Sequence, residues 1–516
     1  MYQQISDEGE MKKGRTKNII LSIAAGFMYE LVSLACGLVS QRLILSNFGS
    51  AYNGITQSIT QFISYIELMK AGIGGVTVAA IYKPLAEKDF HEVSEVIASG
   101  QKFMKRIAMI FLAFVLCVAV IYPTFIVKDF DWWFTASLIL IISISTFVQY
   151  YLGFTYQLLI EADQKGYIMI NMQMITTVLN TIVSIVLINS GCSIQIVKLG
   201  SALVHIIGPI FFNIYVHKNY PIDDKVKVTG DKIPQRWDAA AHEVAAFINS
   251  STDVTVVTLF AGVLEVSVYS TYNYVIHNIK KIVTKFSGGF ANAFGDMYAK
   301  GEIEHMKKSL GLFELIIYSM ISILYPVALS LIVPFVMLYT KGVTDVNYNR
   351  PLFALVLTLA SIFNCFRIPY RTTVIAIGHY KQTRNGAIVE AIINVTVSVL
   401  CTIKFGVIGV AIGSMCAMAT RSYEFASYLS KKIINRPMRQ YFSHVFVTLT
   451  ILFGVYLLSK LYIVNVENWL MWFVYAVITT LITITLTVVT DFLFYREDTK
   501  YLLERVKRII LRKKNA

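Results

Sequence analysis

Charged side chains are scarce in this sequence. Asp, Glu, Lys and Arg together make up 15% of its 516 residues, whereas soluble domains carry roughly 25%. The deficit extends along the whole chain, which is 56% hydrophobic and has a mean hydropathy of +0.60. This composition excludes an ordinary soluble domain.

Cysteine patterns are absent as well. The six cysteines show neither metal-site spacing nor a disulfide framework. Five of them fall inside apolar runs, where we interpret them as small apolar fillers. We also expect no cleavable signal peptide, because the apolar run behind the basic N-terminus is too long and lacks a small-residue cleavage pattern. That run is predicted to be a first membrane-spanning helix.

Apolar stretches of about twenty residues recur along the chain, and each is long enough to cross ~30 Å of hydrocarbon as a helix. In lipid the backbone polar groups must be satisfied within the segment, and the alternation typical of barrel strands is missing. The sequence therefore predicts an all-α polytopic membrane protein with about fourteen transmembrane helices. The predicted spans are 18–44, 53–80, 107–126, 132–157, 167–189, 196–216, 242–260, 267–295, 310–338, 351–377, 387–403, 406–429, 441–459 and 469–494.

The distribution of Lys and Arg predicts the orientation. With the N-terminus inside, the inner segments hold 32 basic residues and the outer loops hold 5, as expected if basic residues are retained in the cytoplasm. Both termini are then cytoplasmic. The net charge of +14 and the pI of 9.2 follow from this bias, and no soluble basic domain is left to bind nucleic acid.

A weak internal repeat divides the chain. Tyr156, Asn180 and Ser184 recur in the same order and at the same spacing as Tyr370, Asn394 and Ser398. Two six-helix lobes in parallel orientation around a central cavity form an alternating-access architecture. The predicted parts are a cytoplasmic N-terminus (1–17), an N-lobe (18–216), an inter-lobe linker (217–241), a C-lobe (242–429), helices 13 and 14 (430–495) and a basic cytoplasmic tail (496–516).

Several cations fall inside predicted spans. Each costs at least ~2.5–3.5 kcal/mol at a helix centre, so we expect them to line a wet interior. Polar residues recur every four positions from Asn273 to Lys285, and Arg367 and Arg371 share a helix face. Hydrogen bonding within a static bundle is the alternative for each stripe. The candidate binding residues for an anionic ligand are Arg42, Lys70, Lys281, Lys285, Arg367, Arg371 and Arg421.

Two acids are candidates for ion coupling. Asp253 lies among Ser and Thr residues in its span with no basic neighbour there, so coupling to a proton or sodium gradient is predicted. A permanent partner on another helix, Lys281 or Lys70, is the alternative. Glu67 is the second candidate, although it can also pair with Lys70 at i+3.

Several local strings carry a resemblance that covers nearly the whole chain. They are Ser50–Thr56, Glu67–Gly75, Ile81–Asp89, Ala162–Tyr167, Ser250–Thr255 and Val268–Asn273. In order and spacing they resemble the polysaccharide transporter family of the multidrug/oligosaccharidyl-lipid/polysaccharide (MOP) exporter superfamily. The resemblance implies a flippase in a bacterial cytoplasmic membrane, which moves undecaprenyl-diphosphate-linked oligosaccharide repeat units to the outer leaflet for capsule, O-antigen or exopolysaccharide assembly.

The expected partners are that lipid-linked oligosaccharide and membrane lipid, with the polysaccharide polymerase machinery as a further candidate. No cofactor and no catalytic residue are predicted. A peptidoglycan-precursor flippase is the nearest alternative, since its substrate carries the same pyrophosphate. A drug antiporter of the superfamily would favour an acid-rich cavity. A membrane enzyme is disfavoured because the predicted outer loops are short and lack paired carboxylates.

Overall fold

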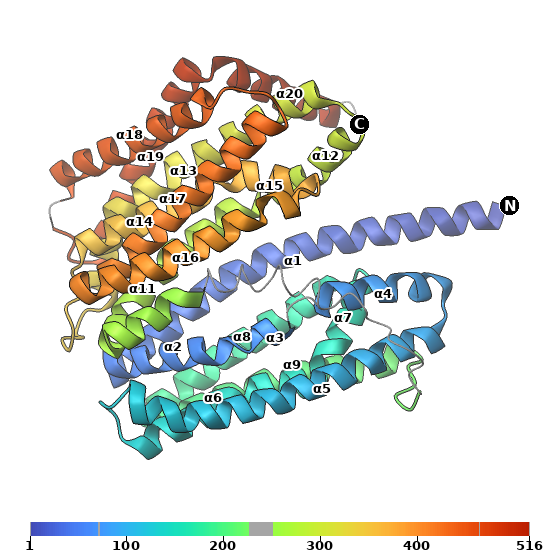
Figure 1. Ribbon diagram of the computed structural model, residues 1–516, viewed down its shortest axis with the longest axis vertical. Helices are drawn as coiled ribbons and strands as arrows, with labels where there is room; N and C mark the ends of the chain where they lie inside the picture. Colours follow the sequence, from blue (N-terminus) through green and yellow to red (C-terminus); the bar gives the residue numbers. More distant parts are fainter. Residues whose placement is uncertain (1, 71–72, 227–250, 464, 515–516) are drawn as a thin grey trace. The chain divides into compact units, whose positions relative to one another are not determined.

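The structure is a computed structural model that describes the backbone of residues 2–70, 73–226, 251–463 and 465–514. Side chains are described for residues 18, 21–69, 73–226, 251–463, 465–504 and 507. The chain divides into two compact units, unit 1 (Met1–Ser251) and unit 2 (Thr252–Ala516). The helices of each unit can be followed in Figure 1.

Unit 1 is helical throughout its described part. Asp89 and Asp131 cap two of the helices, each accepting a hydrogen bond of 3.0 Å from the backbone N–H three residues later. The helices are α1 (Tyr2–Phe48), α2 (Ser50–Ser64), α3 (Glu67–Lys70), α4 (Ile73–Glu87), α5 (Phe90–Ile121), α6 (Trp132–Val148), α7 (Phe154–Ala162), α8 (Gly166–Asn189) and α9 (Ile194–Asn219), with π-helical turns η1 (Tyr122–Ile126) and η2 (Gln149–Gly153).

Unit 2 is also helical. A short apolar helix (Ser251–Phe260) begins at the unit boundary. The helices that follow are α11 (Val263–Lys285), α12 (Gly288–Ala299), α13 (Ile303–Tyr339), α14 (Pro351–Phe366), α15 (Ile368–Ala376), α16 (Tyr380–Phe405), α17 (Val407–Lys432), α18 (Arg439–Tyr462), α19 (Trp469–Phe494) and α20 (Arg496–Lys514).

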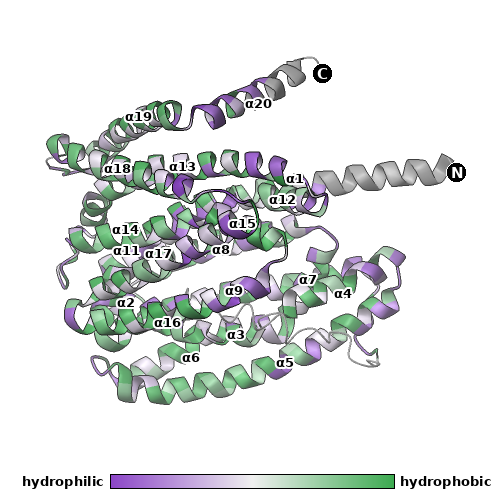
Figure 2. Cartoon of the chain, turned by 45° about the horizontal axis from the view of Figure 1, so that its top comes forward, coloured by the Kyte–Doolittle hydropathy of each residue, from purple (hydrophilic) through white to green (hydrophobic). Residues whose placement is uncertain are grey.

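Ten of the described helices are long and apolar enough to cross a membrane, or eleven if the bent α2–α4 pair counts as one span. Hydrophobic residues cover most of α5 and α19, whereas α20 is richer in hydrophilic residues (Figure 2). The predicted all-α, multi-pass class is thus confirmed, and the count of fourteen is approximate. The predicted span 53–80 is three separate helices, and the part of span 242–260 before Ser251 lies outside the described residues.

The repeat is visible in the helix bounds. Helices α7 and α8 start at Phe154 and Gly166, with the same spacing as the starts of α15 and α16, and α9 is as long as α17 and follows at nearly the same offset. Packing repeats as well, since α9 lies against α6 and α8 while α17 lies against α14 and α16.

Even one polar contact recurs between the two halves of the repeat. In unit 1 Ser201 Oγ donates to Asn180 Oδ1, and in unit 2 Asn394 Nδ2 donates to Ser414 Oγ (3.4 Å). The two asparagines belong to the strings that indicate the repeat in the sequence. Bounds, packing and this contact together show that the repeated strings occupy matching places in the two units.

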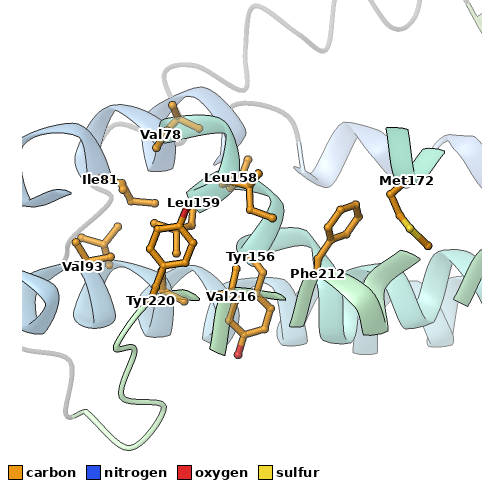
Figure 3. Close-up of a cluster of buried hydrophobic side chains, with 14 residues drawn as sticks. Val78, Ile81, Val93, Tyr156, Leu158, Leu159, Met172, Phe212, Val216 and Tyr220 are labelled. Atoms are coloured by element: carbon orange, nitrogen blue, oxygen red, sulfur yellow. The ribbon is translucent and has the colours of Figure 1, made fainter. Parts of the chain in front are cut away.

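A buried apolar cluster fixes one end of unit 1, where α4, α5, α7 and α9 meet. Figure 3 shows Tyr220 beside Leu159 in this cluster. The chain after α9 is held there, because the Asp223 backbone N–H donates to Ser94 Oγ (3.0 Å) and Ile222 packs on the cluster. The first residues of the predicted linker 217–241 are therefore fixed to unit 1. Residues 227–241 lie outside the described residues.

Candidate functional site

A helix break in unit 2 positions the first candidate arginines. Helix α14 ends at Phe366, and α15 begins at Ile368 with Pro369 in its first turn. Proline has no N–H to donate and favours the first turn of a helix, so it suits this restart. Arg367 occupies the junction itself, and the backbone N–H of Arg371 donates to its carbonyl (2.8 Å).

Arg367 belongs to a partly buried ion cluster that also contains Arg421. The Nη1 atom of Arg367 lies 2.7 Å from Oε1 of Glu390, and the Nε atom of Arg421 lies 3.3 Å from its Oε2. Arg421 Nη1 also lies 2.5 Å from Glu424 Oε2. The side chains of Glu390 and Arg421 are each only 6% exposed. Two cations thus meet two carboxylates, which is how buried charge is tolerated.

Gly386 makes room for this cluster. A Cβ at this position would overlap the carboxylate oxygens of Glu424 and the Nη1 atom of Arg421. A further contact supports Arg421, whose guanidinium lies 4.1 Å from the ring centroid of Phe425, within cation–π range. The sequence indicates Arg367 and Arg421 as candidates but not that two acids from α16 and α17 balance them.

Arg371 adds a positive charge that these two acids do not balance. It lies one turn beyond Arg367 on α15, its side chain is exposed, and it interacts electrostatically with Arg367, Glu390 and Arg421. Glu390 and Glu424 are already bound to the other two arginines. The α15–α17 cluster therefore carries a net positive charge, with Arg371 at its exposed side.

The lysines of α11 divide between two faces. The predicted stripe of Asn273, His277, Lys281 and Lys285 is exposed or half-buried, while the buried residues of α11 include Tyr269, Tyr272 and Ile276. Lys280 is one of the cations inside the predicted spans but not one of the candidate binding residues, yet it interacts electrostatically with Asp253 and Arg367. Lys280 lies eleven residues after Tyr269, which is about three helical turns, so the two side chains share one face of α11. This spacing is the signal in the sequence that could have identified Lys280.

Asp253 is held by neutral hydroxyl groups. Tyr269 donates to its Oδ2 (2.8 Å), and Ser414 Oγ lies 2.9 Å from both carboxylate oxygens. Asn394 in turn donates to Ser414. In the described part of the chain Asp253 forms no ion pair, so neither Lys281 nor another described cation is a direct partner. Lys280 is near enough to interact electrostatically.

The remaining candidates lie in unit 1. Arg42 is half-buried on α1, and Glu67 begins α3 with an exposed side chain that interacts electrostatically with Tyr150. Lys70 ends α3, and its side chain lies outside the described residues. The structure thus brings together Arg367, Arg371 and Arg421, while Arg42, Lys70 and Glu67 belong to the other unit. Across the described residues, no group of three or more His, Cys, Asp and Glu forms a metal site.

Comparison with known proteins identifies the fold. The sequence matches no protein-family model and no curated protein. Among solved structures, the lipid II flippase MurJ in an inward closed conformation is similar over 93% of this chain and 99% of its own, with a TM-score of 0.70 at 16% identity.

Two MATE transporters are also similar. A multidrug resistance MATE family transporter of the MOP superfamily, in an inward-facing conformation, matches over 80% of this chain and 99% of its own (TM-score 0.54, 15% identity). The eukaryotic MATE transporter AtDTX14 matches over 84% and 99% (TM-score 0.54, 12% identity). The predicted fold class is confirmed: this multi-pass membrane protein has the fold that the flippase MurJ shares with MATE transporters of the MOP superfamily.

Proposed function

We propose that this chain is a flippase that moves undecaprenyl-diphosphate-linked oligosaccharide repeat units from the inner to the outer leaflet of a bacterial cytoplasmic membrane. It would act by alternating access and without catalytic chemistry. The observation that carries the proposal is the gathering of positive charge in unit 2. Glu390 and Glu424 balance Arg367 and Arg421, Arg371 adds a further cation beside them, and α11 contributes three lysines.

A pyrophosphate group suits these cations. Its oxygens can accept a bidentate pair of hydrogen bonds from an arginine, and a lysine adds a compact point charge. Arg371 is exposed and is backed by a rigid ion cluster, so it can meet a ligand without losing a carboxylate partner. A transporter of cationic drugs would favour the opposite sign of charge, so the described charges support an anionic cargo.

Asp253 is our candidate for coupling to a proton or sodium gradient, with Glu67 as a second acid. The hydroxyl groups of Tyr269 and Ser414 can donate to a carboxylate or accept from a protonated acid, and their oxygens can also face a bound cation. Either state would let Asp253 respond to a gradient. We expect Asp253→Asn to fold and bind substrate but to lose gradient-driven transport.

Lipid II is the second candidate cargo. A specific observation favours it, since MurJ resembles this chain over nearly its full length. Lipid II carries the same kind of anionic pyrophosphate on the same kind of lipid, so the cations of unit 2 suit both substrates. The two candidates differ in the group that the pyrophosphate carries.

Reconstitution separates the two cargoes. Purified protein in liposomes would be supplied with undecaprenyl-diphosphate-linked oligosaccharide from the producing cells or with lipid II, and translocation would be measured by access of an impermeant glycan-cleaving enzyme. We expect the oligosaccharide lipid to move faster than in protein-free liposomes, and an imposed ion gradient to increase its rate only when Asp253 is present. Movement of lipid II alone would contradict the proposed cargo.

A further inference from the structure

A polar cavity lies inside unit 1, whereas the ion cluster and Asp253 belong to unit 2. It has a volume of about 160 Å³ and lies between the α6–η2–α7 segment, α8 and α9. Its polar lining consists of Ser145, Gln149, Gln157, Gln173, Thr176 and His205. No carboxylate, lysine or arginine lines it. A cavity of this volume holds about five waters at ~30 Å³ each.

The side chains around this cavity have unused hydrogen-bonding capacity. In the part of the chain that the structure describes, the side chains of Ser145, Gln149, Gln157, Gln173 and His205 donate and accept no hydrogen bonds within the protein. Polar groups at membrane depth are costly unless they are satisfied. Gln173 and His205 are exposed, and Ser145, Gln149 and Gln157 are half-buried, so all five side chains can reach polar groups that enter this one space from elsewhere.

The backbone adds further acceptors. Pro209, inside α9, has no N–H, so the carbonyl of His205 four residues earlier loses its usual helical donor. The π-helical turn η2 places Gln149 at the cavity, and such turns are frequent at functional sites. Gly153 at the end of η2 packs directly on Pro209, where a Cβ would lie 2.6 Å from the proline Cβ. Both irregular segments are thus held side by side at the cavity wall.

The internal repeat explains why the cavity is open. Its positions in unit 1 correspond to those of the ion cluster in unit 2, where long charged side chains occupy the space. When α7, α8 and α9 are aligned with α15, α16 and α17 by their first residues, the matched pairs are Gly153 with Arg367, Gln157 with Arg371, Thr176 with Glu390 and Gly208 with Arg421. Gly208 lies at the cavity wall where unit 2 has Arg421, and none of the matched positions in unit 1 carries a charge, so unit 1 holds a neutral void where unit 2 holds its own charges.

We propose that this cavity binds the hydroxyl groups of one uncharged sugar of the lipid-linked cargo, an inference that rests on the proposed function. An amide presents a donor and an acceptor on one rigid group, which matches neighbouring hydroxyls of a sugar ring. Phe212 and Met172 supply apolar surface for the ring's C–H groups. The absence of formal charge in the lining disfavours the pyrophosphate, and the volume limits the ligand to part of one sugar.

The depth of the cavity suits such a ligand. Gln157 lies five residues from the end of α7, and Met172 lies six residues after the start of α8. At 1.5 Å per residue these positions are about 8–9 Å from the helix ends that carry the predicted cytoplasmic connections. The glycan of a lipid made on the cytoplasmic side would enter the membrane from this end.

Binding of two lipids to the full chain in nanodiscs tests the proposal. The probes are bare undecaprenyl diphosphate and the undecaprenyl-diphosphate-linked oligosaccharide from the producing cells. We expect Gln157→Leu and Gln173→Leu each to weaken binding of the oligosaccharide lipid by up to about tenfold, from loss of one or two hydrogen bonds, with binding of the bare lipid unchanged. Gln195→Leu, on α9 but outside the cavity lining, is the matched control and should change neither.

A second measurement does not depend on the stability of these variants. In a background without the native cysteines, Ser145→Cys should react with a small thiol reagent, and the oligosaccharide lipid but not the bare lipid should protect it. Unchanged discrimination in both glutamine variants, or equal protection by both lipids, would overturn the inference and leave only water in the cavity. Equal weakening for both lipids would overturn it too. If the wild type binds neither lipid, the proposed function itself fails.

Discussion

Helices α7 to α9 of unit 1 correspond to helices α15 to α17 of unit 2, but the side chains between them differ. Their bounds follow each other at a nearly constant offset, and their Asn–Ser contacts match as well. In unit 2 the shared space holds Arg367, Glu390 and Arg421, whereas in unit 1 it is a neutral cavity. The two helix sets have the same backbone arrangement. Their side chains differ, so the shared space contains an ion cluster in unit 2 and a neutral cavity in unit 1.

Under the proposed function, each unit would meet a different part of the cargo. An ion cluster that satisfies itself is rigid, and it supports the exposed Arg371 without needing a ligand. A neutral cavity with unused hydrogen-bonding groups needs polar occupants to complete it. An amphiphilic substrate with a charged pyrophosphate and an uncharged glycan offers one group of each kind. The two halves of the repeat would then recognise different parts of one molecule.

The largest effect should come from discharging the cluster in unit 2. Glu390→Gln leaves Arg367 and Arg421 without their shared carboxylate, and loss of one partner of a buried pair costs about 3–5 kcal/mol of unfolding free energy. The matched change in unit 1, Thr176→Val, should cost about 1 kcal/mol or less, because it removes one neutral hydroxyl donor that the backbone carbonyls of Met172 and Gln173 share. Thermal unfolding in detergent measures both. Equal losses of stability in the two variants would contradict the view that unit 2 contains a charged cluster where unit 1 contains a neutral cavity.

The repeated Asn–Ser contact gives a second test. Ser414→Ala removes hydrogen bonds to the carboxylate of Asp253, and bonds to charged groups contribute about 1.5–3 kcal/mol. Ser201→Ala removes only a bond to the Asn180 amide, with an expected cost of about 0.5–1.5 kcal/mol. We expect Ser414→Ala to cost more stability than Ser201→Ala, because only Ser414 contacts a carboxylate. A larger loss of stability in Ser201→Ala would contradict this. The same unfolding assay applies.

Crowding at Gly386 should give the smallest effect. Gly386→Ala would push the Arg421–Glu424 pair aside, and overpacking costs about 1–3 kcal/mol, partly offset by the better helix propensity of alanine. Gly75→Ala is the control, because a Cβ there meets nothing within 4 Å and should be neutral or slightly stabilising. A melting temperature that is unchanged by Gly386→Ala would show that the ion pair has room to move.

The fold was largely predictable because the bilayer requires long apolar helices, and such segments are visible in the sequence. The all-α class, the long apolar spans and the repeat at Tyr156, Asn180 and Ser184 follow from hydrophobic runs and local strings, and the helices of the structure agree with them. The break within the predicted span 53–80 was missed, since hydropathy continues across it. Length and apolarity show that a segment can cross a membrane but not whether it does so as one straight helix.

The candidate site was only partly predictable. Single-helix spacing correctly placed Arg367 and Arg371 one turn apart, but the acids that balance Arg367 and Arg421 lie on other helices, and pairing between helices depends on packing. The interaction of Lys280 with Asp253 and the hydroxyl partners of Asp253 were missed for the same reason. The neutral cavity of unit 1 carried no charge signal at all. Its glutamines stand out only after the repeat is aligned with the ion cluster.

The most direct test of the account is lipid translocation by variants of two cations of unit 2, the exposed Arg371 and the half-buried Lys281. In liposomes supplied with undecaprenyl-diphosphate-linked oligosaccharide, we expect Arg371→Ala and Lys281→Ala to fold and to lose at least about tenfold in translocation rate, as for loss of a charge-assisted contact. Arg371→Lys should stay impaired, since an ammonium cannot form the bidentate contact. The exposed Arg384 on α16 provides the control variant Arg384→Ala, expected at the wild-type rate. Full translocation by both Arg371→Ala and Lys281→Ala would contradict an anionic cargo bound by unit 2.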